Sequence, residues 1–364
     1  MRPETRSGSD TATGGTGTLV SVITACFNMG GFLRETIESV RAQSYQPIEM
    51  IVVDDGSNDD TWDIIQSAGP LVRGLRQPHV GQSRARALGV AAARGRYLLF
   101  LDADDLLAPD TVAGGVSALQ DRPDTIAASN WRRLVQKGKR WVAAPAEIPF
   151  PATDRDPLRA WLLGSWLPPC CLLWPRDVYE RVGGWDEQLT TNEDGDLIYR
   201  ALAGGVRLAR TTAGEALYRS HGDARLSVSA DVIAEHRFRS RMRVLEKLGA
   251  FLTERGTLPR YREPLGVAWQ RLALLGYEDH PDLARECLRT GEEYAGRRLV
   301  SRTLPGRVLT WMLGLERKEA VVQTLARFGL ATKQRRRYSR LRQIPKLERE
   351  WSAGPDGPPP SSPE

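Results

Sequence analysis

Three acidic residues, Asp102, Asp104 and Asp105, follow directly after an apolar run and are the first candidates for metal chemistry in this sequence. The apolar run, residues 97–101, is typical of a strand that is buried on both faces of a sheet. Its acids must therefore emerge at the carboxyl end of the strand, where open α/β sheets bind ligands. Asp102 and Asp104 point to one side of an extended chain, so both carboxylates can share one hard divalent cation. A solvated turn is the alternative for these residues, and we expect Asp105 to cap the helix that follows.

A second pair of acids, Asp54 and Asp55, also ends an apolar run, residues 48–53. Strands are expected at 19–25, 48–53, 71–76 and 97–101. Helices are expected between them: one that contains residues 33–40 and ends near 43, one that contains 61–64, and one at 81–93. This alternation predicts an α/β fold with a parallel, right-handed, doubly wound sheet. Carboxyl ends of parallel strands meet at one edge, so both acid clusters should face one crevice.

Composition indicates a soluble, globular chain, because 41% of the 364 residues are hydrophobic and 26% are charged. No stretch reaches the roughly 18 apolar residues that a membrane span needs. The four cysteines form no Cys-X-X-Cys pair, so unpaired thiols in a reducing cytosol are expected rather than disulfides or a zinc site.

The net charge of +6 is uneven, since residues 331–350 hold eight basic and two acidic side chains. Such an excess can attract anionic lipid headgroups. The expected location is the cytoplasm, with peripheral contact at the inner face of the membrane through 331–350. A solvated basic helix face is the alternative, and no nucleic acid partner is expected.

Several motifs, in this order and spacing, resemble those of family 2 glycosyltransferases of GT-A fold. They are residues 22–28, Asp54-Asp55-Gly56-Ser57 followed by Asp60-Thr61, Gly81-X-Ser83-X-Ala85-Arg86, residues 100–105, residues 182–186 and residues 192–197. The resemblance covers roughly residues 19–227. Ala25 stands where the family usually has proline, and Ala87 where asparagine commonly follows the arginine.

The resemblance implies transfer of a sugar, with inversion, from a nucleotide-diphosphate sugar donor to a glycan or lipid-linked acceptor in cell-envelope or exported polysaccharide synthesis. The implied cofactor is Mg²⁺ or Mn²⁺, with Asp104 as direct ligand and with Asp102 and His221 as further candidates. Phe27 can stack on a nucleobase, and Asp54 or Asp55 can accept hydrogen bonds from the base or ribose. Donor-binding candidates are Ala25, Phe27, Asp54, Asp55, Arg86 and Asp102.

Glu193 and Asp194 open an expected helix at 193–203, where anions are favoured. In the family's motif the second acid is the base, so Asp194 is the candidate base and Glu193 its support. Helix capping is the alternative role. A nucleotidyltransferase of related architecture and a non-catalytic sugar-nucleotide-binding protein are the alternative functions.

The chain is expected to divide into four parts. These are a disordered lead-in at 1–17, a GT-A domain at 18–229 with a nucleotide half at 18–140 and an acceptor half at 150–229, a basic helical extension at 230–350, and a disordered proline-rich tail at 351–364. Within the extension, helices are expected at 231–248, 281–291 and 318–329.

Overall fold

The computed structural model describes residues 17–138, 140–145, 156–221, 234–277 and 279–296. Residues 1–16 of the expected lead-in, the expected helix at 318–329, the basic stretch 331–350 and the tail 351–364 lie outside the described residues. The division of the chain into four parts therefore stays a prediction.

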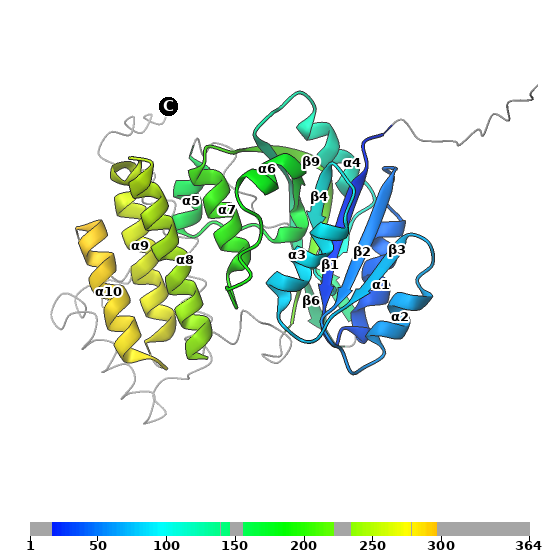
Figure 1. The fold of residues 1–364 in the computed structure, drawn as a ribbon, viewed down its shortest axis with the longest axis horizontal. Coiled ribbons are helices and arrows are strands. Elements are labelled where there is room, and N and C mark those ends of the chain that lie inside the picture. Colours follow the sequence, from blue (N-terminus) through cyan, green and yellow to red (C-terminus); the bar gives the residue numbers. More distant parts are fainter. Residues whose placement is uncertain (1–16, 139, 146–155, 222–233, 278, 297–364) are drawn as a thin grey trace, which may run out of the picture.

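A mixed sheet of nine strands among the described residues forms the centre of the molecule, and helices cover it (Figure 1). The elements are β1 (Val20–Cys26), α1 (Gly30–Arg41), β2 (Ile48–Asp54), α2 (Thr61–Ser67), β3 (Val72–Arg76), α3 (Gln82–Ala92), β4 (Tyr97–Phe100), β5 (Leu106–Leu107), α4 (Thr111–Leu119), β6 (Thr125–Lys137), β7 (Arg140–Ala143), α5 (Pro157–Leu163), η1 (Pro169–Cys171), β8 (Leu172–Pro175), α6 (Arg176–Arg181), α7 (Glu193–Ala203), β9 (Arg207–Ser220), α8 (Glu235–Glu254), α9 (Leu258–Gly276) and α10 (Pro281–Ala295).

The first four long strands confirm the parallel arrangement that the sequence predicts. Their order is β3-β2-β1-β4, and every neighbouring pair is parallel. Strand β2 is buried on both faces: Ile51 and Val53 pack with Ala85 of α3, whereas Met50 and Val52 belong to the larger core on the other face. Continuous apolar strands are needed because helices cover both sides of the sheet.

The carboxyl ends of these strands lie together, as expected. Cys26 at the end of β1 is in register with Asp54, and Ile23 is in register with Phe100. The acids after β2 and the acids after β4 therefore emerge at the same edge of the sheet.

The second half of the sheet is mixed, and its longest strands were not expected. Strand β8 is antiparallel to β4 and β6, and β6 is parallel to β9. Neither strand was recognisable from the sequence, because both are polar. In β6, for example, Arg132 and Arg133 interrupt the apolar alternation.

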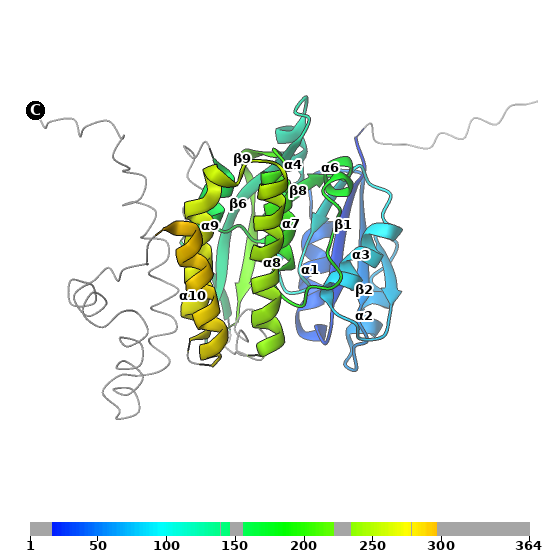
Figure 2. The same cartoon turned by 60° about the vertical axis from the view of Figure 1, so that its left-hand side comes forward.

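In the described C-terminal part, helices α8, α9 and α10 pack side by side, with α8 against α7 and α9 against α5 (Figures 1 and 2). Helix α8 packs on α7, where Lys247 pairs with Asp186 at 2.6 Å and with Asp196 at 2.7 Å. The Ser240 hydroxyl accepts hydrogen bonds from the backbone N–H groups of Thr190 and Thr191. Helix α8 therefore holds the loop that leads into α7.

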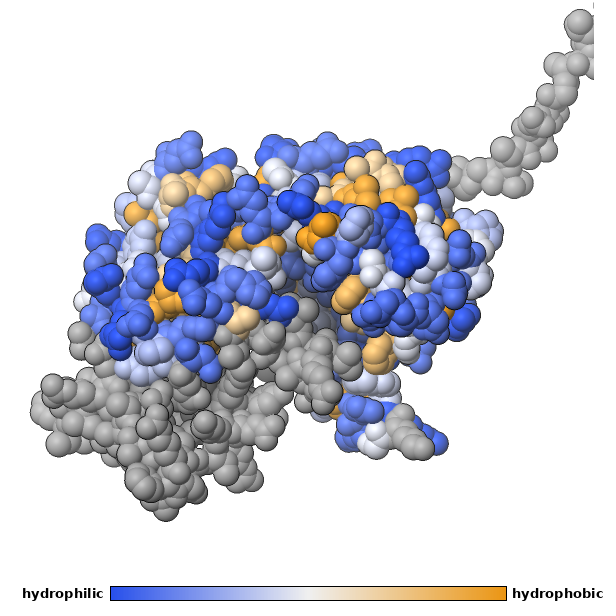
Figure 3. All heavy atoms as spheres, turned by 60° about the horizontal axis from the view of Figure 1, so that its bottom comes forward, coloured by the Kyte–Doolittle hydropathy of each residue, from blue (hydrophilic) through white to orange (hydrophobic). Residues whose placement is uncertain are grey.

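The face of the molecule drawn in Figure 3 is mainly hydrophilic. Figure 3 shows one face, on which hydrophobic residues form small groups among hydrophilic ones. Among the helices of the described ranges, none combines the length and the apolar character required to cross a membrane.

Candidate active site

Asp102, Asp104 and Asp105 lie at the carboxyl end of β4 in three different environments. Asp102 and Asp104 are partly exposed, whereas Asp105 is buried. The Asp105 carboxylate accepts the backbone N–H of Arg219 at 2.8 Å, so it fixes the end of β9 instead of capping a helix. The expectation of a helix cap was wrong, because the next helix, α4, begins only after Asp110.

These carboxylates lie close together, so their mutual repulsion favours binding of a cation. Burial and the neighbouring Asp104 and Asp102 charges raise the pKa of Asp105 well above its usual range. Burial also raises the pKa of Asp102, an effect that Arg86 opposes and Asp104 strengthens. A divalent cation at this point would offset the repulsion between the carboxylates.

His221 lies beside Asp104, with 2.6 Å between its Nε2 atom and Asp104 Oδ2. Its ring sits between two aromatic rings, with centroids 5.1 Å from Phe32 and 5.4 Å from Trp141. The described residues contain no group of three side chains that could hold a metal by themselves. The donor set nevertheless fits Mg²⁺ or Mn²⁺, since such ions are usually held by one or two carboxylates together with substrate phosphates and water.

Arg86 of α3 joins the two acidic parts of the site. Its Nη2 atom lies 2.5 Å from Asp102 Oδ1, and its Nη1 atom lies 3.1 Å from Glu193 Oε1. The guanidinium also stacks over the Trp185 ring at 4.7 Å. Burial would lower the pKa of Arg86, but Asp102 and Glu193 outweigh it and raise that pKa. The structure therefore brings the end of β4 and the start of α7 together through one buried cation.

Glu193 and Asp194 begin α7, as expected, but face different surroundings. Glu193 is buried against Arg86, whereas Asp194 is half-buried and contacts Trp166, whose Nε1 donates to Asp194 Oδ2 at 3.5 Å. The charge of Asp194 contributes to the raised pKa of Asp102, which places both carboxylates in one electrostatic site.

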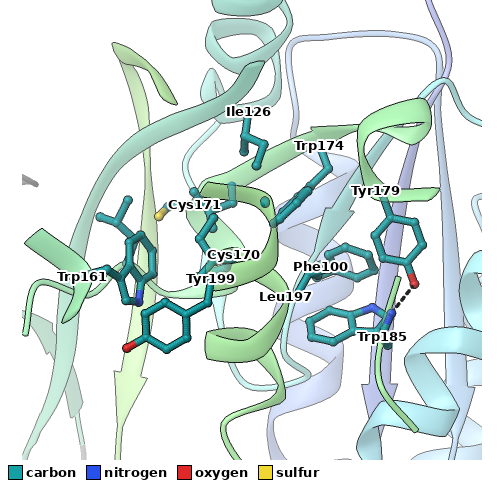
Figure 4. Close-up of a cluster of buried hydrophobic side chains, with 14 of the residues drawn as sticks. Phe100, Ile126, Trp161, Cys170, Cys171, Trp174, Tyr179, Trp185, Leu197 and Tyr199 are labelled. Atoms are coloured by element: carbon teal, nitrogen blue, oxygen red, sulfur yellow. Dashed lines mark hydrogen bonds between the residues drawn. The ribbon is translucent and has the colours of Figure 1, made fainter. Parts of the chain in front are cut away.

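Buried aromatic side chains pack near Asp194. Figure 4 shows Trp161 and Tyr199 on one side of this cluster and Phe100, Trp185 and Tyr179 on the other, where the backbone N–H of Trp185 donates to the Tyr179 hydroxyl. A cavity of about 10 Å³, lined by Asp194 and by several of these aromatic side chains, can hold at most one water molecule. Burial raises the pKa of Tyr199 to about 12.

The donor-side candidates lie at the ends of β1 and β2. Phe27 is 37% exposed and stacks on His79 with ring centroids 4.0 Å apart, which leaves an aromatic surface open to solvent. Ala25 is half-buried beside Val53.

Asp54 and Asp55 accept hydrogen bonds from groups of the protein itself. Asp54 accepts from Ser57 N–H at 2.9 Å and pairs with Arg76 at 3.0 Å. Asp55 accepts from the N–H groups of Val80 at 3.0 Å and Gly81 at 2.9 Å. These bonds fix the loops around Phe27, and direct contact of either carboxylate with the donor stays a prediction.

Other residues of the site were not expected from the sequence. Gln82 donates to Asp102 Oδ1 at 3.2 Å, and His79 supports Phe27. Trp166 contacts Asp194, although nothing in the sequence distinguishes it from the tryptophans of the core. Gln82 lies inside the Gly81–Arg86 motif, so the motif could have pointed to it, whereas His79 and Trp166 carry no such signal.

Comparison with known proteins agrees with the resemblance of the motifs. Residues 21–183, somewhat less than half of the chain, match the sequence profile of Glycosyl transferase family 2. This part of the chain is therefore similar to glycosyltransferase family 2.

Two relatives illustrate the similarity. An uncharacterised glycosyltransferase of Rickettsia prowazekii is 30% identical over 184 residues, which cover 50% of this chain and 58% of the relative. The Escherichia coli protein WfaP, a UDP-Glc:alpha-D-GlcNAc-diphosphoundecaprenol beta-1,3-glucosyltransferase, is 28% identical over 224 residues, covering 60% of this chain and 82% of WfaP. The chain spans only 31% of a relative from Rickettsia felis.

The fold is confirmed by a solved structure. Mannosyltransferase PcManGT from Pyrobaculum calidifontis, in complex with GDP-Man and Mn²⁺, superposes with a TM-score of 0.53 and 18% identity, covering 92% of this chain and 88% of PcManGT. The described part of the chain therefore has the GT-A fold.

Proposed function

We propose that the chain is a metal-assisted, inverting glycosyltransferase that uses a nucleotide-diphosphate sugar. One observation carries the proposal: Arg86 connects Asp102 after β4 with Glu193 at the start of α7. This connection supports a metal site and a general base that act together at one edge of the sheet.

Donor binding is assigned to the edge formed by β1, β2 and β4. The exposed Phe27 ring would stack on the nucleobase, while the loops fixed by Asp54 and Asp55 would shape the pocket around it. Asp104 and His221 would hold Mg²⁺ or Mn²⁺, with Asp102 in support. When bound, that ion would stabilise the charge that grows on the departing diphosphate.

Asp194 is assigned as the general base. The acceptor hydroxyl would attack the anomeric carbon of the donor sugar and form the new glycosidic bond, while the bond to the diphosphate breaks. Asp194 would take the hydroxyl proton, and a single displacement inverts the anomeric centre. Glu193 would hold Arg86 in place, since their side chains are 3.1 Å apart.

The acceptor is proposed to be a glycan or a lipid-linked sugar in cell-envelope or exported polysaccharide synthesis. The activity of WfaP supports this class of acceptor, because WfaP acts on a sugar that is carried by a lipid diphosphate. Peripheral membrane contact through residues 331–350, and a cytoplasmic location, belong to the same proposal.

Substitution of Asp194 tests its assignment as the general base. Asp194→Asn keeps the shape of the side chain but cannot take a proton, so turnover should fall about 10²- to 10⁴-fold while donor binding is retained. Full turnover by a folded Asp194→Asn variant would contradict the assignment. Calorimetry with UDP and with GDP in the presence of Mn²⁺ checks donor binding, and turnover by the wild-type protein separates an enzyme from a non-catalytic binder.

A further inference from the structure

Arg219 lies near the end of β9, shortly before His221, and its side chain is only 1% exposed. Its guanidinium contacts two aromatic rings at once. The Cζ atom is 4.8 Å from the ring centroid of Phe32 and 4.8 Å from that of Trp141. Cation–π contacts of this kind strengthen when the cation is removed from water. The position of the guanidinium is therefore closely tied to the positions of both rings.

The same two rings also hold the imidazole of His221. The centroid of the His221 ring lies 5.1 Å from that of Phe32 and 5.4 Å from that of Trp141, and both contacts are edge-to-face. The two aromatic rings are 6.2 Å apart, and they come from α1 and β7. Because each ring contacts both Arg219 and His221, removal of the guanidinium should shift the rings and, with them, the imidazole.

Glu35 of α1 balances the charge of Arg219. The Arg219 Nη2 atom lies 2.8 Å from Glu35 Oε2, and the Glu35 side chain is 62% exposed. The Nε atom of Arg219 is buried and has no hydrogen-bond partner in the described part of the chain. An unpaired buried donor costs stability, so a role other than stability accounts better for an arginine at this position.

Backbone hydrogen bonds link this cluster to the acids after β4. The N–H of Arg219 donates to Asp105 Oδ1 at 2.8 Å, and the Thr36 hydroxyl of α1 donates to the carbonyl of Ala103 at 2.9 Å. Ala103 directly precedes Asp104 in the sequence. Helix α1 and Arg219 therefore fix both the turn that carries Asp104 and the imidazole that lies beside it.

We propose that Arg219 is a positioning residue for the candidate metal site. Through the two aromatic rings it keeps the imidazole of His221 beside the Asp104 carboxylate, where Nε2 and Oδ2 are 2.6 Å apart. The inference rests on the proposed function, because that function takes Asp104 and His221 as metal ligands. A planar guanidinium suits this role, since it can stack on aromatic rings and pair with a carboxylate at the same time.

Titration of the full chain with Mn²⁺, followed by the electron paramagnetic resonance signal of the free ion, tests this role. Arg219→Met keeps a long side chain but removes the planar cation. It should weaken Mn²⁺ binding by about 10- to 100-fold, which is typical for residues that orient metal ligands. Arg219→Lys keeps the charge without the planar fork and should bind Mn²⁺ with intermediate affinity. Equal affinity of the wild type and a folded Arg219→Met variant would overturn the proposal.

Arg132→Met is the matched control that separates positioning from general stability. Arg132 is another arginine that pairs with a glutamate, since its Nε donates to Glu215 Oε2 at 2.8 Å and joins β6 to β9. Its loss should lower the urea midpoint but leave the dissociation constant for Mn²⁺ unchanged. Equal weakening of Mn²⁺ binding by Arg132→Met and Arg219→Met would show a general loss of stability and overturn the proposal.

Trp141→Leu keeps the proposal testable if Arg219→Met does not fold. Trp141 is only half-buried, so the fold should tolerate its replacement better than that of the buried arginine. The variant loses the ring that contacts both Arg219 and His221, and it should therefore also weaken Mn²⁺ binding. Unchanged Mn²⁺ affinity in folded Trp141→Leu would contradict the role of the rings and overturn the proposal.

Asp104→Asn distinguishes failure of this inference from failure of the proposed function. The wild-type protein should bind Mn²⁺, and Asp104→Asn should lose most of that binding. Absence of Mn²⁺ binding by the wild type, or equal binding by Asp104→Asn, would overturn the metal site of the proposed function together with this inference. Mn²⁺ binding that depends on Asp104 but not on Arg219 would overturn the inference alone.

Discussion

Arg86 shows most clearly how single residues build this site. Its side chain is 4% exposed, and it contacts Asp102, Glu193 and the ring of Trp185. Lysine could not make the same contacts, because only a planar guanidinium can pair with two carboxylates and stack on an indole at once. The motif that contains Arg86 was readable in the sequence, but its partner Glu193, 107 residues later, was not.

We predict that Arg86→Met destabilises the fold by about 3–5 kcal/mol, because it leaves two largely buried carboxylates without their cation. Turnover should fall as well, since Asp102 and Glu193 would repel each other. Urea unfolding of the wild-type protein and of Arg86→Met measures the loss of stability. Arg84→Met is the control, because the Arg84 pair with Glu187 is exposed and spans 3.7 Å, so its loss should cost about 1 kcal/mol or less. Equal urea midpoints for both variants would contradict this account of Arg86.

The four cysteines give a second prediction at this scale. All four are buried and unpaired, which agrees with the sequence expectation of free thiols. Burial raises the pKa of each thiol, to about 12 for Cys287. Because thiolates are the reactive species, Ellman's reagent at pH 8 should modify far fewer thiols in the native protein than in denaturant. Complete, rapid modification of the native protein would show that the thiols are accessible.

Helices α7 and α8 show how elements position the site. Helix α7 has the bounds that the sequence predicts, because polar residues open it and Gly204-Gly205 end it. Its placement was not predictable, since it depends on Ser240 and Lys247 of α8, which carry no recognisable motif. Helix α9 was missed because Pro264 lies inside it, and proline normally interrupts a helical pattern.

We predict that Lys247→Met lowers the free energy of unfolding at pH 7 by about 2 kcal/mol, since Asp186 and Asp196 lose their shared cation. Burial alone would raise the pKa of Asp186, but the hydrogen bond and charge of Lys247 outweigh it and lower that pKa below the usual 3.8. A lowered carboxyl pKa stabilises the fold above 3.8, and this contribution disappears as pH falls through the folded-state pKa.

The destabilisation caused by Lys247→Met should therefore shrink between pH 5 and pH 3, which urea unfolding at several pH values can measure. Arg239→Gln serves as the control, because Arg239 is an exposed residue of the same helix and pairs with Glu235 at 2.8 Å. A destabilisation that is the same at pH 7 and pH 3 would show that Lys247 acts through packing rather than charge.

At the scale of the whole molecule, the site exists because both halves of the sheet end at one edge. The sequence predicted the parallel half, since buried strands and their terminal acids are local features. It did not predict β6 and β9, whose pairing joins distant and polar segments. For the same reason His221, one residue after β9, could be proposed from the family resemblance, but its contact with Asp104 depends on the complete sheet.

Metal binding gives a prediction for the whole molecule. Mn²⁺ at 100 times its dissociation constant should stabilise the wild-type protein by about 2.7 kcal/mol, because only the folded chain brings Asp104 and His221 together. Asp104→Asn should remove most of this increase in melting temperature. Asp110→Asn, which changes an exposed acid bound to Ser44, should not. An identical Mn²⁺ response in all three proteins would place the metal elsewhere.

The most direct test of the central claim is release of nucleoside diphosphate from a panel of nucleotide sugars, with and without Mn²⁺. We predict Mn²⁺-dependent release from one donor, its loss in Asp104→Ala, and a strong reduction in Asp194→Asn. Release that is independent of metal and unchanged in both folded variants would contradict the claim that Asp104 and Asp194 carry the reaction.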